Sequence, residues 1–302
     1  MQITRRRLMT GAVALGAMGA LPRLGFSATT ITLGETTIDT LSDGHLVLPT
    51  EFVSPNPGAI EMLAKFGITT PQVEAPCNVT LLRDGTNTVL FDVGAGPDFM
   101  PTAGKLSAAL DALGVTPEDI THVVFTHAHP DHLWGVLDEF DEPIFANAQH
   151  MMGRAERDFW LSPEAATQMP HGREVFAAGA LRRLSVLEDR LATFEDSEEI
   201  LPGIGARAST GHTPGHMAFE IRSGNTAVML TGDAIGNGHL AFAVPDWISG
   251  SDQDGETGIS TRLGLLAELS ASGLPMIGYH LPEGGIGRVE RAGDAYRFVA
   301  EI

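Results

Sequence analysis

Thr126-His127-Ala128-His129-Pro130-Asp131-His132 is the stretch of this 302-residue chain that decides its fold. It directly follows His122-Val123-Val124-Phe125, a β-branched and aromatic run that predicts a buried strand ending at the histidines. Imidazole and carboxylate groups are ligands that suit zinc and related divalent ions. Because residues two apart in an extended segment point the same way, His127 and His129 can bind one ion. Asp131 and His132 follow on the turn and can face a second ion.

The same arrangement recurs later in the chain. Strand-like runs lie between residues 190 and 230, and His212 and Asp233 each follow the end of such a run. In the first half, Asp84-Gly85 between two apolar runs indicates a hairpin. Strand pairs, loops and helices in both halves predict two stacked β-sheets with helices outside, an α/β sandwich with its site along one common edge.

These segments resemble the signature of the metallo-β-lactamase superfamily. The resemblance extends from about Asn78 to the C-terminus, and it implies an αββα sandwich of two mixed sheets flanked by helices. The companion segments occur in the expected order, which is Phe91-Asp92-Val93-Gly94-Ala95-Gly96, Gly211-His212-Thr213-Pro214-Gly215-His216, Thr231-Gly232-Asp233 and Tyr279-His280.

The resemblance implies a centre with two divalent metal ions. One ion would be held by His127, His129 and His212, the other by Asp131, His132 and His280, and Asp233 would bridge both. Three protein ligands with an open position are typical of catalytic sites, and two ions together acidify a shared water. The implied nucleophile is therefore a bridging hydroxide.

Three residues near the metals have additional expected roles, Asp131 from the chemistry of the centre and Asp92 and His216 from the resemblance. Asp131 could also take or guide a proton during turnover. Asp92 and His216 would support the metal loops through hydrogen bonds without being ligands.

The ligand set leaves the metal open among zinc, iron, manganese and cobalt, because all donors are nitrogen or oxygen. His129 stands where a flavodiiron oxidoreductase would place a glutamate, which favours hydrolysis over redox chemistry. Zinc is the default.

Several segments resemble methyl-parathion hydrolase and its lactonase relatives, namely Asp158-Phe159-Trp160-Leu161-Ser162, Leu201-Pro202-Gly203-Ile204, Gly285-Ile286-Gly287 and Tyr296-Arg297-Phe298-Val299. Those relatives open lactones or cleave phosphotriesters in an apolar pocket, which here implies Phe99, Trp160 and Phe176 as pocket residues. The alternative is that the aromatic residues of the helical region 150–189 only pack its helices together.

A tyrosine between His212 and Asp233, which some lactonases use to hold the ring oxygen, is absent. That absence weakens an acyl-homoserine-lactone assignment.

The sequence thus predicts a metal-dependent hydrolase of small neutral esters, lactones or organophosphate triesters. The alternative enzymes are a β-lactamase or a glyoxalase-type thioesterase, although the basic C-terminal patch expected for glutathione thioesters is missing. A non-catalytic metal-binding protein of the same fold is the hypothesis from a different class, and the complete ligand set disfavours it.

The chain is strongly acidic, with 38 Asp and Glu against 19 Lys and Arg and a net charge of −19. Such a surface repels phosphate backbones, so nucleic acid is not expected as a partner. The single cysteine, Cys77, excludes an intramolecular disulfide.

The Pro-rich residues 49–76 predict a surface excursion at the mouth of the site or at a homodimer contact.

Residues 1–28 resemble an export signal. Thr4-Arg5-Arg6-Arg7-Leu8-Met9 is similar to a twin-arginine motif, and an apolar stretch too short to span a bilayer comfortably follows it. We therefore expect a periplasmic or secreted protein with its hydrolase domain at 29–302 and no stable membrane insertion after signal removal. The alternative is an uncleaved N-terminal anchor.

Overall fold

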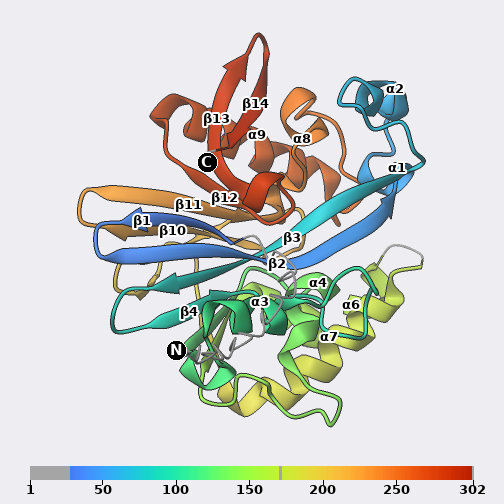
Figure 1. Ribbon diagram of the computed structural model, residues 1–302. Helices are drawn as coiled ribbons and strands as arrows, with labels where there is room; N and C mark the ends of the chain where they lie inside the picture. The colour runs from blue at the N-terminus through green and yellow to red at the C-terminus, as the bar shows by residue number, and fades with distance from the viewer. Residues whose placement is uncertain (1–27, 170–171, 301–302) are drawn as a thin grey trace, which may run out of the picture.

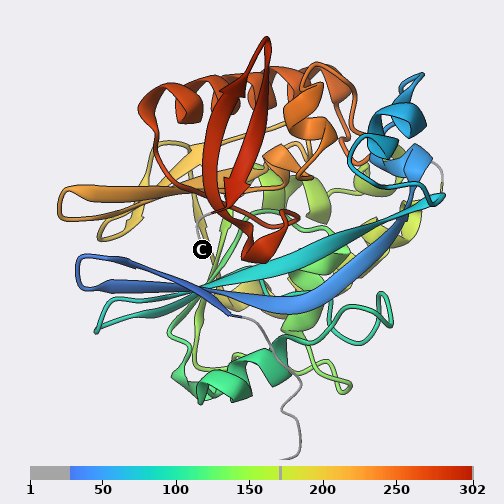
Figure 2. The ribbon, with the colours of Figure 1, turned by 45° about the horizontal axis from the view of Figure 1, so that its top comes forward.

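The computed structural model describes residues 28–169 and 172–300, which form two seven-stranded β-sheets packed face to face between layers of helices (Figure 1, Figure 2). The αββα sandwich expected from the sequence is confirmed. The export-signal prediction concerns residues 1–28, and all of these except residue 28 lie outside the described part of the chain.

The first sheet holds its strands in chain order. Its strands are β1 (Thr29–Leu33), β2 (Thr36–Pro49), β3 (Gln72–Arg83), β4 (Thr88–Phe91), β5 (His122–Phe125), β6 (Gln149–Gly153) and β7 (Leu191–Phe194). Strands β1 to β4 pair antiparallel, whereas β4 to β7 pair parallel. Parallel strands end at the same edge of a sheet, so the residues that follow β4 and β5, Asp92 and the histidine cluster, emerge side by side.

The second sheet also contains a parallel pair of strands whose ends share one edge. Its strands, in spatial order, are β14 (Ala295–Ala300), β13 (Ile286–Ala292), β12 (Met276–Gly278), β11 (Thr226–Gly232), β10 (Met217–Ser223), β9 (Ile204–Ala208) and β8 (Glu199–Leu201). Only β11 and β12 pair parallel among these described strands. Their shared edge presents Asp233 directly after β11 and His280 shortly after β12.

The helices are α1 (Thr50–Val53), α2 (Ala59–Ala64), α3 (Leu106–Leu113), α4 (Pro130–Leu133), α5 (Arg154–Leu161), α6 (Ala165–Gln168), α7 (Glu174–Leu187), α8 (Leu240–Ala243) and α9 (Gly255–Ser272). Helices α3 and α9 end at Gly114 and Gly273, whose positive φ of 70° and 66° suits a glycine C-cap. In residues 28–169 and 172–300, no helix combines the length and apolar composition that spanning a bilayer requires.

The Pro-rich residues 49–76 form the outer end of the long β2–β3 hairpin (Figure 2). Helices α1 and α2 lie at its tip, and we call residues 46–76 the arm. The arm reaches across to the side of the molecule where α8 lies, and α2 contacts α8. A surface excursion at this place agrees with the sequence prediction.

Three phenylalanines join the two sheets at the centre of the sandwich. The ring of Phe219 on β10 lies 5.2 Å from that of Phe91 on β4 and 5.8 Å from that of Phe194 on β7, measured between ring centroids. All three side chains are buried. Burial of these large apolar surfaces, together with one tilted and one edge-to-face ring contact, is a main source of cohesion between the sheets.

Replacing Phe219 with alanine should therefore lower the free energy of unfolding by about 3–5 kcal/mol, because the cavity opens between both sheets. Urea denaturation measures the loss. Phe140 is the matched control, since its side chain is 76% exposed in a loop. The change F140A should stay within about 0.5 kcal/mol of the unaltered protein. Similar losses for both variants would contradict the assignment of Phe219 to the core.

Candidate metal centre

Asp92 organises the loop that follows β5. Its Oδ1 accepts a hydrogen bond from the backbone N–H of Thr126 at 2.8 Å, and its Oδ2 accepts one from the Thr126 hydroxyl at 2.8 Å. The same Oδ2 lies 2.8 Å from Nδ1 of His132. Asp92 thus contacts both ends of the histidine loop through its carboxylate. These hydrogen bonds are of the kind that the resemblance implied for a supporting residue.

His127, His129 and His212 form one buried group of facing nitrogens. Nδ1 of His129 lies 3.1 Å from Nε2 of His127 and 2.9 Å from Nε2 of His212. Burial, helped by the neighbouring imidazoles, lowers the pKa of His127 and His129 well below the usual 6.5. These two rings are therefore neutral at neutral pH, with the lone pairs that a metal ligand needs.

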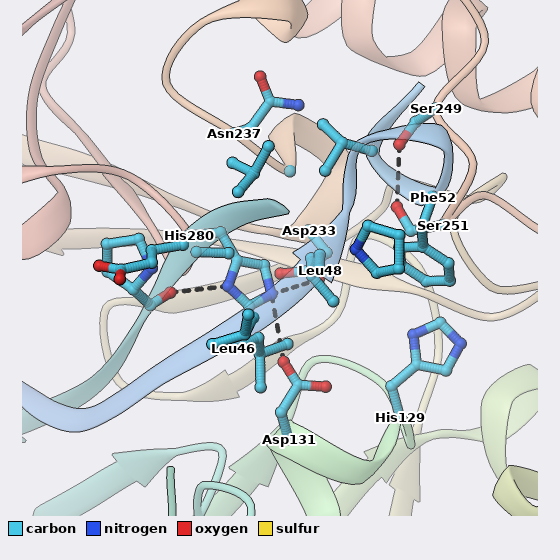
Figure 3. A pocket seen from close by; sticks show the side chains of 18 of the residues that line it. Leu46, Leu48, Phe52, His129, Asp131, Asp233, Asn237, Ser249, Ser251 and His280 are labelled. Carbon is cyan, nitrogen blue, oxygen red and sulfur yellow. Dashed lines mark hydrogen bonds and ion pairs between the residues drawn. The ribbon is translucent and has the colours of Figure 1, made fainter. Parts of the chain in front are cut away.

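Asp131, His132, Asp233 and His280 form a second buried group beside the first. Nε2 of His280 lies 3.2 Å from Oδ2 of Asp131 and 3.1 Å from Oδ2 of Asp233 (Figure 3). Nε2 of His132 lies 3.4 Å from both Asp131 Oδ2 and Asp233 Oδ1. Nδ1 of His280 donates to the carbonyl of Pro76 at 2.7 Å, which turns Nε2 toward the carboxylates.

The second group has the electrostatic character of a cation site. Burial alone would lower the pKa of His132 and His280, yet the carboxylates of Asp233 and Asp131 raise it well above 6.5. Asp131 Oδ2, His132 Nε2 and Asp233 Oδ1 are buried without a hydrogen-bond partner. These atoms lie 3.2–3.4 Å from one another or from His280 without forming a hydrogen bond. Buried polar atoms without a hydrogen bond are costly, so their convergence fits divalent cations. The residues present therefore fit the two-ion centre.

Asp233 lies between the two groups. Besides its contacts to His132 and His280, its Oδ2 lies 3.4 Å from Nε2 of His212. The backbone N–H of Asp233 donates to Nε2 of His216 at 3.0 Å, while Nδ1 of His216 lies 2.8 Å from the Ser209 hydroxyl. Burial lowers the pKa of His216 to about 3. His216 thus holds the backbone of Asp233 in place, and the carboxylate of Asp233 faces nitrogens of both groups. Its role as a bridging metal ligand stays a prediction.

An apolar cavity of about 370 Å³ opens directly onto the centre. Leu46, Leu48 and Phe52 of the arm line this cavity together with Asp131, Asp233 and His280 (Figure 3). The predicted pocket residues Phe99 and Phe176 line the cavity and contact each other edge to face at 5.8 Å. The predicted location of residues 49–76 at the mouth of the site agrees with this lining.

Trp160 does not line the cavity, and its predicted pocket role is corrected. Its side chain is 1% exposed, packs edge-on against the ring of His129 at 5.8 Å, and donates its indole N–H to Oε1 of Glu156 at 2.6 Å. Trp160 points inward because a buried carboxylate needs donors, and an indole N–H is one.

Glu156 is a site residue that the sequence reasoning missed. From α5, its Oε1 also accepts from the N–H of Ala128 at 2.9 Å, and its Oε2 accepts from the hydroxyl of Thr213 at 2.7 Å and the N–H of Gly215 at 3.0 Å. One carboxylate thereby ties the His127–His129 loop to the His212 loop. No sequence motif surrounds Glu156, and only its i, i+4 spacing to Trp160 could have suggested a buried pair.

Asn78 on β3 was also missed. Its side-chain amide donates to the carbonyls of Tyr279 and Leu281, both at 2.8 Å, and so holds the loop of His280 from either side. The hydroxyl of Tyr279 donates to the backbone carbonyl of Asp131 at 2.6 Å. The two Asn78 contacts join residues 201 and 203 positions apart, and Tyr279 and Asp131 are 148 positions apart. No local pattern predicts such pairing.

The chain belongs to the metallo-beta-lactamase superfamily, whose family model matches residues 73–272. Among curated proteins, it is similar to the N-acyl homoserine lactonase AiiB of Agrobacterium fabrum, with 23% identity over 209 residues that cover 63% of this chain and 70% of that one. The AttM lactonase of Azorhizobium caulinodans is 31% identical over 144 residues, 46% of this chain and 48% of AttM. The predicted enzyme class, a metal-dependent hydrolase, agrees with these matches.

Solved structures share the fold over nearly the whole described chain. The dizinc quorum-quenching lactonase AidC, in complex with its product N-hexanoyl-L-homoserine, matches with a TM-score of 0.86 and 24% identity, covering 91% of this chain and 97% of AidC. The hydrolase AbOPH of the beta lactamase superfamily matches with a TM-score of 0.86 and 24% identity, covering 93% and 99%. At this level of identity the likeness shows the fold.

Replacing His129 with alanine should remove one of two bound ions and most of the hydrolytic activity, because two imidazoles remain where three converge. Metal analysis of the purified variant measures the stoichiometry. The control is H122A, since His122 begins β5 and precedes the cluster in sequence. Partial burial lowers the pKa of His122, and the charge that opposes this shift is that of Asp84, which is not one of the metal ligands. H122A should retain both ions. Unchanged turnover and two ions in H129A would contradict the ligand assignment.

Proposed function

We propose that the protein is a dinuclear, zinc-dependent hydrolase that opens lactones or cleaves related neutral esters with an apolar substituent. The observation on which this proposal depends is the joining of a seven-residue ligand set to one apolar cavity. The named lactonases among the relatives support the lactone class. The twin-arginine-like segment supports a periplasmic or extracellular place of action.

Two zinc ions would be held by the ligands predicted from the sequence, which are His127, His129 and His212 for one, Asp131, His132 and His280 for the other, and Asp233 between them. When bound, such a pair polarises the substrate oxygen and acidifies a shared water toward neutral pH. Because the donors are buried and preorganised, little reorganisation is needed during the reaction.

The chain's own residues would bind, orient and exclude water. The apolar wall formed by Leu48, Phe52 and Phe176 takes up the substituent, which directs the ester carbonyl to the polar end of the cavity. Cleavage of the ester C–O bond leaves an alkoxide that needs a proton. Asp131 lies at that end of the cavity. Although burial opposes it, the neighbouring His132 and His280 lower the pKa of its carboxyl below the usual range, so this carboxylate would pass a proton on to the alkoxide rather than hold it.

A neutral substrate fits the electrostatics of the protein. The cavity wall is apolar and the whole chain carries a net charge of −19, which disfavours the approach of anionic substrates. Beta-lactams and glutathione thioesters carry carboxylates, whereas lactones, simple esters and phosphotriesters do not. The net negative charge therefore favours lactones, simple esters and phosphotriesters over beta-lactams and glutathione thioesters as substrates.

A substrate panel tests the proposal. The zinc-loaded protein is assayed with lactones of increasing acyl length, an aryl ester, paraoxon, a chromogenic beta-lactam and a glutathione thioester. We expect kcat/KM for the lactones to exceed that for the beta-lactam and thioester at least about a hundredfold, a difference of about 2.7 kcal/mol in transition-state binding. Dipicolinate should abolish the activity and zinc should restore it. Preference for the beta-lactam or thioester, or no turnover at all, would overturn the proposal.

The arm should select the acyl chain. Replacing Phe52 with alanine removes part of the cavity wall, so KM for a long-chain lactone should rise about tenfold, equal to about 1.4 kcal/mol of lost apolar contact. A short-chain lactone should be affected much less. The control is I60A on the same arm, because Ile60 is 65% exposed and does not line the cavity. Equal effects on both chain lengths would exclude Phe52 from acyl binding.

A further inference from the structure

A short segment between α8 and α9 follows the outer side of the three-histidine group. The backbone N–H of Gln253 donates to the carbonyl of His212 at 3.1 Å, and the N–H of Asp254 donates to the carbonyl of Gly211 at 2.9 Å. The segment is thus fastened to the His212 loop by main-chain bonds. Figure 3 shows the preceding Ser249 and Ser251 side by side at the cavity, with their hydroxyls 2.9 Å apart.

Asp252 faces the outer nitrogen of His212. Its Oδ1 lies 3.3 Å from Nδ1 of His212, and both side chains are at most 3% exposed. A carboxylate only accepts hydrogen bonds, so the Nδ1 that faces it must hold the ring proton. That tautomer leaves the lone pair on Nε2, the atom that lies 2.9 Å from His129 Nδ1 inside the centre. Asp252 therefore selects the form of His212 that can bind a metal.

Asp252 is itself held rigidly. Arg262 on α9, whose side chain is 3% exposed, places Nη1 3.3 Å from Oδ2 of Asp252. The same guanidinium donates from Nε to the carbonyl of Pro245 at 3.0 Å and from Nη2 to that of Trp247 at 2.7 Å. A Cβ on Gly258 would lie 2.4 Å from Asp252 Oδ2, so α9 packs directly against the carboxylate.

Gln253 faces the outer nitrogen of His129. Its side-chain amide lies 3.4 Å from Nε2 of His129, while Nδ1 of that ring points into the centre. Binding a metal through Nδ1 requires the ring proton on Nε2, which then needs an acceptor. Rotating the side-chain amide of Gln253 by about 180° exchanges its nitrogen and oxygen and presents the oxygen to that proton. Consecutive residues thus face the outer nitrogens of two histidines in the same group.

We propose that Asp252, anchored by Arg262 and assisted by Gln253, is a positioning residue that fixes the tautomer and orientation of His212 and so sets the affinity of the three-histidine ion. This inference rests on the proposed two-ion centre. It concerns one ion only, because neither Asp252 nor Gln253 contacts the side chains of Asp131, His132 or His280 in the interactions described.

The test compares D252A, D252N and D254A as full-length proteins stripped of metal and titrated with Zn²⁺ and Co²⁺. In D252A, affinity for the three-histidine ion should fall about 10–100-fold and the cobalt absorption of that site should change, while the other site keeps its ion. D252N should recover most of the loss, because an amide oxygen still accepts from Nδ1–H of His212. Circular dichroism verifies that each variant is folded.

D254A is the matched control for the segment. The Asp254 side chain is exposed and caps α9 by accepting from the N–H of Thr257 at 3.1 Å. Removing it should cost about 1 kcal/mol of stability but leave both metal affinities unchanged. If D252A does not fold, Q253A gives an independent test, with a smaller loss of affinity expected at the same ion.

The outcomes separate this inference from the proposed function. A wild-type protein that binds no metal would overturn both. A wild-type protein with two ions, together with D252A of unchanged affinity and unchanged cobalt spectrum, would overturn the positioning role alone. Equal losses in D252A and D254A, or at both ions in D252A, would show a merely structural role and would also overturn it.

Discussion

The structure depends on one electrostatic constraint, the burial of seven imidazole and carboxylate side chains with their donor atoms facing one another. Buried polar atoms are expensive when unpaired, and here Asp131, His132 and Asp233 each leave one such atom without a hydrogen-bond partner. Divalent cations offset that cost, which links metal binding directly to the stability of the fold. The centre is therefore both the candidate catalytic site and the contact that holds the strand-end loops together at one edge of the sandwich. Without the cations, the polar side chains of these loops would be buried at a cost in free energy.

Around this centre, other buried polar groups hold the loops in register. Asp92 fixes the loop after β5, Glu156 joins that loop to the one of His212, and Asn78 holds the loop of His280. Each accepts from or donates to backbone groups of segments distant in sequence, so each fixes the geometry of a different pair of loops. This arrangement resembles the preorganisation expected of catalytic centres, in which ligands are oriented before a substrate arrives. The β-sheets supply the common edge, and these side chains adjust the loops on it.

Substrate choice is separated from the metal chemistry in this architecture. The polar end of the cavity is built by strand-end loops of both sheets. Its apolar wall comes from Leu46, Leu48 and Phe52 of the arm, from Phe99 in the loop after β4 and from Phe176 on α7. Changes in the arm can alter the size of the bound group without moving a ligand. This division allows substrate preference to change without a change in the metal ligands, because loops tolerate change more readily than the elements that hold the centre.

The sequence by itself determined the fold class and the metal-binding group, because a dense ligand motif at the end of a buried strand and its companions at later strand ends are local patterns. Helix α3 (Leu106–Leu113), which ends at Gly114, has a local signal of the same kind, because glycine suits the positive φ of a helix C-cap. Only the tertiary structure decided which side chains meet across long separations. It turned Trp160 inward to a buried glutamate and brought the arm over the centre. It also set Asp252 behind His212. A local pattern sets the face on which a side chain lies, but its partner depends on the packing of segments that the chain joins only when it folds.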